Sequence, residues 1–433
     1  MRRRVLLRCS TDAFRPFDYR MPYDKAMRVL GHNSGNLLFL SAIQRYLTHD
    51  EVELAVEFFE SNSGFSPIDE SYDSCIINCA NWIGAQTREL LKLLADGLEH
   101  VKVPVYLIGL GVQSPSIGNY AFLETIRDEA KAMIRAVLNT GGGFGLRGQF
   151  TADVFERLGF RDYSVIGCPS MYQQSPELKI SNEKVTRADF NPLINGELYS
   201  MDRGFARMYH KYPQSGFVCQ NQFYKILYCA SELTESDMRN LLKYPDEVLR
   251  LLRNGKVKLY ADMFTWFRTI KSDGFNFSFG SRVHGNFAAA LVGIPAFIHT
   301  TDSRTEELAD FFSIPHQQTM GTVDLYDLYL QTDYSDFNRL FPRRYDEFCQ
   351  FLRKHDLPFK LGRNEAYDKI YSQVPENIPP GIADEVKRVI DEYLSYKPPG
   401  LLSLFWRDKR FWYLLGKKKM RRLSLLEGKK GLG

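Results

Sequence analysis

The sequence contains no long hydrophobic run. Its longest apolar stretch covers residues 287–298 and includes Gly293 and Pro295. A transmembrane helix needs about 20 consecutive apolar residues, so this stretch cannot cross a bilayer. The first segment, MRRRVLLRCSTD, is basic but has only three apolar residues in a row, too few for a secretory signal. These features predict a cytoplasmic protein, unless its tail holds it to a membrane face.

Cysteine is sparse, and its spacing does not suggest a metal site. The seven cysteines are scattered, and Cys75 and Cys79 have no second close pair that would complete a zinc site. Most lie in apolar, strand-like stretches, which is typical of reduced core thiols in a cytosolic protein. The sequence also lacks an Asp-X-Asp motif for a metal-bound nucleotide sugar. We therefore predict no metal and no cofactor; metal-dependent glycosyl transfer is disfavoured, and metal-independent transfer stays open.

The chain as a whole has little excess of one charge sign, but its C-terminal tail is strongly basic. The net charge is +4, yet residues 401–433 contain ten basic and two acidic residues, which leaves −4 on the rest of the chain. A negative body argues against a general nucleic-acid-binding protein. The tail suits an anionic membrane surface, or else forms a terminal helix with a solvated basic face. Its cations alternate with aromatic side chains, namely Phe405, Trp406, Phe411, Trp412 and Tyr413.

Apolar, strand-like runs alternate with helical stretches along most of the chain, whose 433 residues exceed what one hydrophobic core usually spans. This alternation predicts mostly parallel sheets with helices on both faces. We predict an α/β fold of two facing, Rossmann-like, doubly wound domains, residues 1–172 and 216–332. Residues 173–215 are predicted to be a linker and hinge, and residues 333–433 a helical extension that ends in the basic tail. Ligands are expected where the strands end, in the cleft.

The strongest local feature is the segment SRVHG, residues 281–285, between a predicted strand and an Ala-rich helix. The start of a helix presents free backbone N–H groups that favour an anion. Arg282 adds a planar guanidinium suited to carboxylate or phosphate, and His284 can move protons near neutral pH. Gly285 lets the backbone pass close to a ligand. The alternative is a capped turn with a solvated arginine and a hydrogen-bonded histidine.

This segment and several others resemble the polysaccharide pyruvyl transferase family. After SRVHG and its Ala-rich helix come Gly-Ile-Pro, a strand and the sequence TDSR at residues 301–304. Upstream, NSGN at residues 33–36 is similar to the family's Asn-X-Gly-Asp turn, although Asn36 departs from the commoner Asp. Three further matches are GLGVQ (109–113), LRGQ (146–149) and IGCPS (166–170). The resemblance covers about residues 31–315.

The resemblance implies a fold similar to the two-domain glycosyltransferases of the B type. It implies that phosphoenolpyruvate is the donor, held by Arg282 and Arg147, and that His284 is the catalytic acid–base residue. Arg304 would help with the phosphate or be a surface charge. The pyruvyl group would pass to a saccharide acceptor as a ketal, in capsule, exopolysaccharide or cell-wall synthesis. The acceptor is expected to be lipid-linked, at the cytoplasmic membrane face.

Four other side chains are candidate contacts for the substrates. His32 would be a second proton carrier or a loop hydrogen-bonding residue. Asn33 and Asn36 belong to the resembling turn, and the amide of Asn78 suits sugar hydroxyls, though turn formation explains it equally well. The sequence GFGLRG at residues 143–148 satisfies the dinucleotide pattern G-X-G-X-X-G. Because its glycines fall within a strand-like run, we do not interpret it as a dinucleotide site.

Two other functions remain open from the sequence. One is a metal-independent glycosyltransferase of the same fold with a nucleotide-sugar donor, which would release a nucleoside diphosphate in place of inorganic phosphate. The other is a non-enzymatic saccharide-binding or assembly protein. In that protein His284→Ala would leave function in cells intact.

Overall fold

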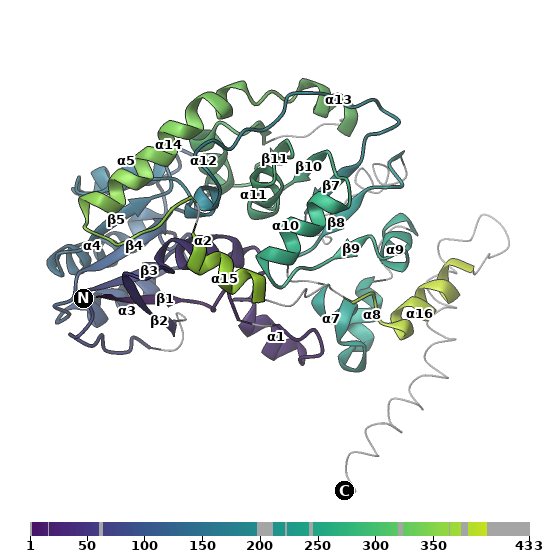
Figure 1. The fold of residues 1–433 in the computed structure, drawn as a ribbon. Helices are drawn as coiled ribbons and strands as arrows, with labels where there is room; N and C mark the ends of the chain where they lie inside the picture. Colours follow the sequence, from purple (N-terminus) through teal and green to yellow (C-terminus); the bar gives the residue numbers. More distant parts are fainter. Residues whose placement is uncertain are drawn as a thin grey trace, which may run out of the picture.

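The computed structural model describes residues 2–15, 17–59, 64–196, 211–220, 223–241, 246–318, 324–362, 364–373 and 380–395. They form two α/β domains, each built on a parallel six-stranded sheet with helices packed against it (Figure 1). The predicted fold class of two doubly wound domains is confirmed. The basic aromatic tail, residues 401–433, lies outside the described residues. Within them, no helix has both the length and the apolarity needed to cross a membrane.

The first domain contains a sheet with the strand order β2-β1-β3-β4-β5-β6. Its central strands are buried along their whole length, as expected where helices cover both faces of a parallel sheet. The order reverses between β1 and β3, so the carboxyl ends of these two strands flank a crevice. The strands are β1 (Arg3–Cys9), β2 (Val52–Phe58), β3 (Ser74–Asn78), β4 (Val105–Leu110), β5 (Gly143–Leu146) and β6 (Ser164–Val165). The helices are α1 (Tyr23–Val29), α2 (Asn36–Leu47), α3 (Arg88–Leu98), α4 (Leu123–Asn139) and α5 (Gln149–Leu158).

The second domain has the strand order β12-β11-β10-β7-β8-β9. This is the Rossmann order, and its direction switches between β7 and β10. The strands are β7 (Pro192–Asn195), β8 (Gly216–Val218), β9 (Val257–Lys258), β10 (Phe277–Gly280), β11 (Ala296–His299) and β12 (His316–Gln317). The helices are α7 (Tyr224–Tyr228), α8 (Glu235–Leu241), α9 (Asp246–Arg253), α10 (Met263–Ser272), α11 (Val283–Leu291) and α12 (Ser303–Phe312).

The predicted linker at residues 173–215 is wrong where it includes β7. This strand is fully buried and pairs with both β10 and β8, so it is central to the second sheet. Its four residues, PLIN, are too few to show a period between polar neighbours. The second domain therefore includes residues 192–195, upstream of the predicted boundary at residue 216.

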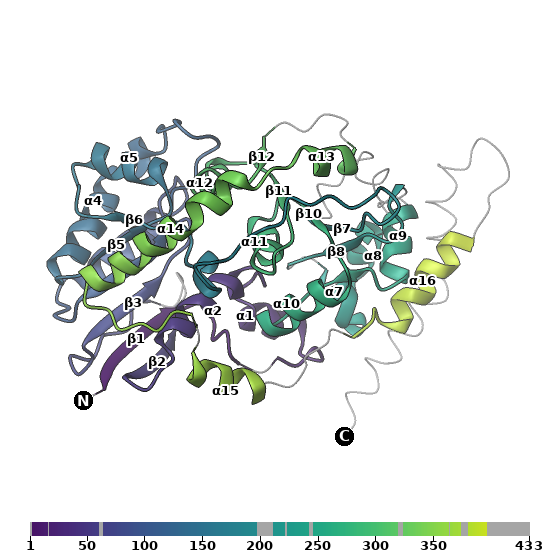
Figure 2. The same cartoon turned by 45° about the horizontal axis from the view of Figure 1, so that its top comes forward.

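The helices after residue 324 pack on both domains. Phe348 of α14 stacks on Tyr172 with ring centroids 4.5 Å apart, and it also contacts Tyr46 of the first domain. In Figures 1 and 2, α14 lies along the first domain, whereas α16 lies beside α9 of the second. The predicted helical character of this region is confirmed for the described helices, which are α13 (Leu325–Gln331), α14 (Ser335–Lys354), α15 (Glu365–Gln373) and α16 (Asp384–Ser395).

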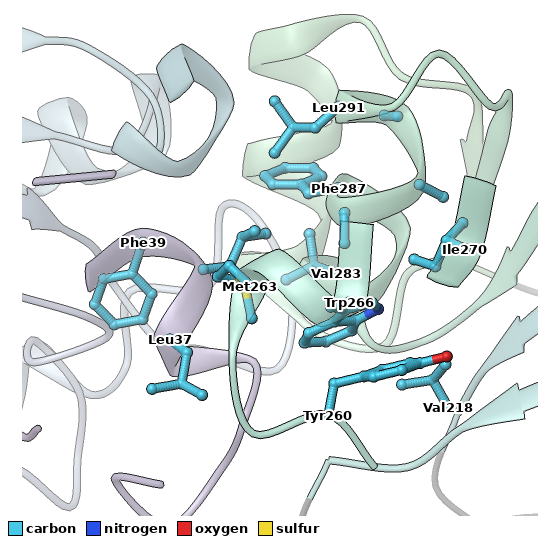
Figure 3. Close-up of a cluster of buried hydrophobic side chains, with 14 of the residues drawn as sticks. Leu37, Phe39, Val218, Tyr260, Met263, Trp266, Ile270, Val283, Phe287 and Leu291 are labelled. Atoms are coloured by element: carbon cyan, nitrogen blue, oxygen red, sulfur yellow. The ribbon is translucent and has the colours of Figure 1, made fainter. Parts of the chain in front are cut away.

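An apolar core joins the two domains directly. Leu37 and Phe39 of α2 belong to the same buried cluster as Met263 of α10 and Val283 and Phe287 of α11 (Figure 3). Burial of such side chains is worth about 1.5–3 kcal/mol each. This contact holds the start of α11 against the first domain, and with it the predicted site.

Candidate active site

The SRVHG segment lies at the topological switch point of the second sheet. Strand β10 ends at Gly280 and α11 begins at Val283, with Arg282 as its N-cap residue and no side chain capping its first turn. His284 is thus in the first helical turn, earlier than the predicted helix start at residue 286. A Cβ atom on Gly280 would lie 1.9 Å from the backbone oxygen of Asn195, so only glycine fits this turn.

Three buried polar side chains fix the turn. Asn195 donates from Nδ2 to Ser278 Oγ at 2.9 Å, and Ser278 Oγ donates to Asn286 Oδ1 at 2.7 Å. Asn286 in turn donates from Nδ2 to the backbone oxygen of Gly280 at 2.9 Å. These hydrogen bonds hold the backbone of the turn, and Asn195 Oδ1 is left without a hydrogen-bond partner among the described residues. Sequence reasoning missed both asparagines, although a polar residue that ends or interrupts an apolar run is a usable signal.

The structure gives Gly285 a different role from the predicted one. A Cβ atom here would lie 2.1 Å from Asn195 Oδ1, inside the second domain. The glycine is therefore required by packing against Asn195. Its contact with a substrate stays a prediction.

Arg147 follows β5 and precedes α5 in the first domain. Its side chain is 2% exposed, and Nη1 donates to Asn81 Oδ1 at 2.6 Å. Its Nε is buried and has no hydrogen-bond partner among the described residues. A buried guanidinium with an unused donor is a costly arrangement unless a ligand completes it.

Arg304 is the second residue of α12. Its Nη2 lies 3.3 Å from Asp302 Oδ2, and its side chain is 32% exposed. Its Nε is also buried without a hydrogen-bond partner in the described part of the chain. Arg304 is therefore partly buried and paired with a carboxylate, and its contact with a phosphate stays a prediction.

The three arginines converge on His284. Burial, followed by the positive charges of Arg147, Arg304 and Arg282, lowers the pKa of His284 well below its ordinary value. The imidazole is therefore neutral near pH 7. Phe39 is a shared neighbour, with its ring centroid 5.3 Å from that of His284 and 5.9 Å from the guanidinium carbon of Arg147. Each arginine stands at the start of a helix, where the dipole adds further positive potential.

The IGCPS segment brings a thiol to the imidazole. Cys168 Sγ lies 3.8 Å from His284 Nε2, and Ser170 Oγ lies 3.0 Å from the same sulfur. All seven cysteines are buried and none forms a disulfide. Among the described residues, no three His, Cys, Asp or Glu side chains are grouped in a way that could hold a metal ion.

Glu307 is a further residue that sequence reasoning missed. Its carboxylate on α12 accepts hydrogen bonds from Thr151 N at 2.6 Å and from Thr151 Oγ1 at 2.9 Å, at the start of α5. Gly148 leaves room for it, because a Cβ atom there would lie 2.4 Å from Glu307 Cγ. Burial raises the pKa of Glu307 to about 7. This contact ties the helix that carries Arg304 to the helix that follows Arg147.

Replacing Glu307 with Gln is expected to make stability less dependent on pH. Because the folded pKa of about 7 lies above the ordinary 4.5, this group's contribution is full below pH 4.5 and is lost as pH rises through 7. At 1.36 kcal/mol per pKa unit, the loss is on the order of 3 kcal/mol. Thermal unfolding near pH 5 and pH 8 measures it, with Glu306→Gln on the same helix as control. Equal losses in wild type and Glu307→Gln would contradict the assignment.

Two predicted asparagines serve the turn between α1 and α2. Asn33 Oδ1 accepts a hydrogen bond from Gly35 N at 2.8 Å, and Asn36 Nδ2 donates to the backbone oxygen of Gly31 at 2.8 Å. One atom of each amide is therefore engaged in local structure, as is common for Asn in turns. Their role as substrate contacts stays a prediction.

The remaining two candidates lie in different surroundings. His32 is exposed and has a left-handed backbone with φ 61° in the same turn. Asn78 is buried at the carboxyl end of β3, beside the switch point of the first sheet. Its Oδ1 has no hydrogen-bond partner among the described residues. Asn78 therefore stays a candidate for binding a substrate hydroxyl. The position of His32 adds no support to its predicted role as a second proton carrier, which stays a prediction.

Comparison with known families agrees with this geometry. The family model described as polysaccharide pyruvyl transferase matches residues 8–303. The chain belongs to this family. It is accordingly a transferase of polysaccharide biosynthesis, and the match includes Arg147, Arg282 and His284 and ends one residue before Arg304.

The solved structures that match this chain have low sequence identity to it and low TM-scores. An Anabaena protein in complex with UDP and glucose is 10% identical, over 86% of this chain and 98% of its own, with a TM-score of 0.39. A UDP-N-acetylglucosamine 2-epimerase is 12% identical, over 86% and 95%, with a TM-score of 0.36. The calicheamicin glycosyltransferase CalG4 is 10% identical, over 82% and 97%, with a TM-score of 0.33. No curated protein sequence matches the chain.

Proposed function

We propose that the protein transfers the pyruvyl group of phosphoenolpyruvate to two hydroxyls of a saccharide as a ketal. The observation that carries this proposal is the convergence of Arg147, Arg282 and Arg304 on the neutral imidazole of His284. Three guanidinium groups at one site favour a small ligand that carries more than one negative charge, and the Nε atoms of Arg147 and Arg304 have no hydrogen-bond partner among the described residues. Phosphoenolpyruvate, with a carboxylate and a phosphate on adjacent atoms, is such a ligand.

The arginines and the start of α11 would divide the two anionic groups between them. A guanidinium matches a carboxylate or a phosphate through two parallel hydrogen bonds. The uncapped first turn of α11 offers backbone N–H groups to a further oxygen. Holding both groups fixes the enol carbon–carbon double bond near His284, which is what proton transfer requires.

The reaction needs one group that moves protons. A proton is added to the methylene carbon of the enol, and positive charge develops on the carbon that carries the phosphate. One sugar oxygen forms a bond to that carbon, the carbon–oxygen bond to phosphate breaks, and a second sugar oxygen closes the ketal. Of the two hydroxyl protons, one ends on the new methyl group and the other on phosphate. We assign the relay of these protons to His284, since bound anions would offset the arginine charges and raise the pKa of His284.

Calorimetric titration with phosphoenolpyruvate tests the donor. If binding raises the pKa of His284, wild type takes up a proton, and the measured heat depends on the ionisation enthalpy of the buffer. We expect tighter binding as pH falls toward the low pKa of the free imidazole. The variant His284→Gln should bind with less proton uptake. Binding of UDP-glucose in preference to phosphoenolpyruvate would instead identify the nucleotide-sugar transferase.

The proposal also includes the acceptor and the place in the cell where the reaction occurs. A saccharide acceptor fits the family, and we propose that it is lipid-linked and used at the cytoplasmic membrane face for capsule, exopolysaccharide or cell-wall synthesis. The ten basic residues of 401–433 support contact with anionic lipid. Co-sedimentation with phosphatidylglycerol vesicles, with and without these residues, tests the contact. Equal co-sedimentation would rule out the tail as the anchor.

A further inference from the structure

A cavity of about 370 Å³ opens where the two domains meet. Its walls are the loop after β4, the turn before α3 and the N-cap residue of α12. Ser303 connects these walls, because its N donates to the backbone oxygen of Ser114 at 3.0 Å and its Oγ accepts from Ser114 N at 2.9 Å. The cavity is thus built by both domains.

Asp302 connects the cavity to the arginine site. One oxygen of its carboxylate caps α12 through Thr305 N at 3.0 Å, and the other lies 3.3 Å from Arg304 Nη2. A ligand that contacts Asp302 in the cavity would therefore lie beside the proposed donor site. The side chain of Asp302 is 16% exposed and lines the cavity.

The lining is nearly uncharged, and its polar side chains include two carboxamides. Gln86 and Gln113 are exposed to the cavity, and neither carboxamide has a hydrogen-bond partner within the described part of the chain. Of the described residues that line the cavity, only Asp302 carries a charge. Carboxamides both donate and accept hydrogen bonds, and a carboxylate accepts them, which matches the alternating donors and acceptors of a polyol.

A second cavity provides a contrast. It has a similar volume of about 380 Å³ and lies at the carboxyl ends of β1 and β2. Its lining includes three cations, Arg15, Lys25 and Arg28, together with two carboxylates. This charged lining does not suit a neutral ligand. Of these two cavities, the one at Asp302 combines a nearly uncharged lining with a contact to Arg304 of the proposed donor site.

We propose that the cavity at Asp302 binds one neutral sugar ring of the acceptor. Its volume falls in the range of small-ligand sites. Gln86 and Gln113 hydrogen-bond the ring hydroxyls, and Asp302 accepts a hydrogen bond from the hydroxyl nearest the donor. This inference rests on the proposed function, because it assigns the second substrate of the same reaction.

Saturation-transfer NMR with methyl glycosides of glucose, galactose and mannose, in the presence of phosphoenolpyruvate, tests the assignment. We expect at least one glycoside to give a signal with wild type, and the double variant Gln86→Ala/Gln113→Ala to lower it at least fivefold. Both glutamines are exposed, so the double variant should fold normally. The matched control is Arg15→Ala/Lys25→Ala in the second cavity, which should leave the signal unchanged.

The outcomes separate the inference from the donor assignment. If phosphoenolpyruvate binds but no glycoside gives a signal, or the signal survives the glutamine double variant, the cavity assignment is wrong and the donor assignment stands. A signal lost in the control places the sugar in the second cavity and also overturns the inference. If phosphoenolpyruvate itself does not bind, the proposed function fails.

Discussion

Replacing His284 with Gln is expected to lower kcat for phosphate release from phosphoenolpyruvate by about a thousandfold. General acid–base catalysis contributes roughly 10²–10⁴-fold, and the amide cannot exchange protons at neutral pH. The affinity for phosphoenolpyruvate should change by less than about tenfold, because the arginines hold its anionic groups. A loss of kcat without a loss of affinity would therefore indicate that His284 transfers protons and contributes little to the binding of phosphoenolpyruvate.

The measurement needs an acceptor and a comparison histidine. A saccharide extract of the source organism supplies the acceptor, and released phosphate is the readout. His316→Gln is the control, since His316 lies on β12 and pairs with Asp310 at 3.3 Å. Retention of more than a tenth of the wild-type rate in His284→Gln would remove the imidazole from the mechanism. Complementation of a null strain by this variant would favour a binding or assembly protein.

The sequence predicts the strands best where burial is complete. All residues of β3 and β4 are buried, so their continuous apolar runs mark them without any alignment. Strand β7 is equally buried, but its four residues lie in the polar stretch 173–215, whose composition predicts a linker. Strands β10 and β11 are no longer than β7, so the polar surroundings of a strand, more than its length, decided whether it was predicted.

The residues of the site could be predicted from the sequence, but not how close to one another they lie. Arg147 and Arg304 come from different domains, and the resemblance alone placed them near one cleft. Their approach depends on tertiary contacts such as the pairing of Glu307 with Thr151, which no local pattern shows. The asparagines of the α1–α2 turn illustrate the opposite error, because the same residue type serves a turn or a ligand.

Replacing Arg147 with Gln is expected to lower the affinity for phosphoenolpyruvate roughly a hundredfold. Loss of a hydrogen bond to a charged group costs about 1.5–3 kcal/mol, and Arg147 offers more than one. The same substitution should leave the melting temperature unchanged or raise it. Burial lowers the pKa of Arg147, and the nearby Arg304 lowers it further, so the guanidinium charge is unfavourable in the folded state.

Arg8 provides a matched control, because it is as buried as Arg147 at 2% exposure and also has one guanidinium nitrogen without a hydrogen-bond partner among the described residues, but it has a carboxylate partner. Its guanidinium lies 3.2 Å from Glu57 Oε2 and donates to the backbone oxygen of Pro67 at 3.0 Å. Arg8→Gln should therefore lower the melting temperature and leave donor affinity unchanged, the reverse of Arg147→Gln. A buried arginine held by its own protein supports the fold, whereas one left without a carboxylate partner is expected to serve a ligand. If both variants lose stability and neither loses affinity for phosphoenolpyruvate, Arg147 is a structural residue and the proposed anion site is wrong.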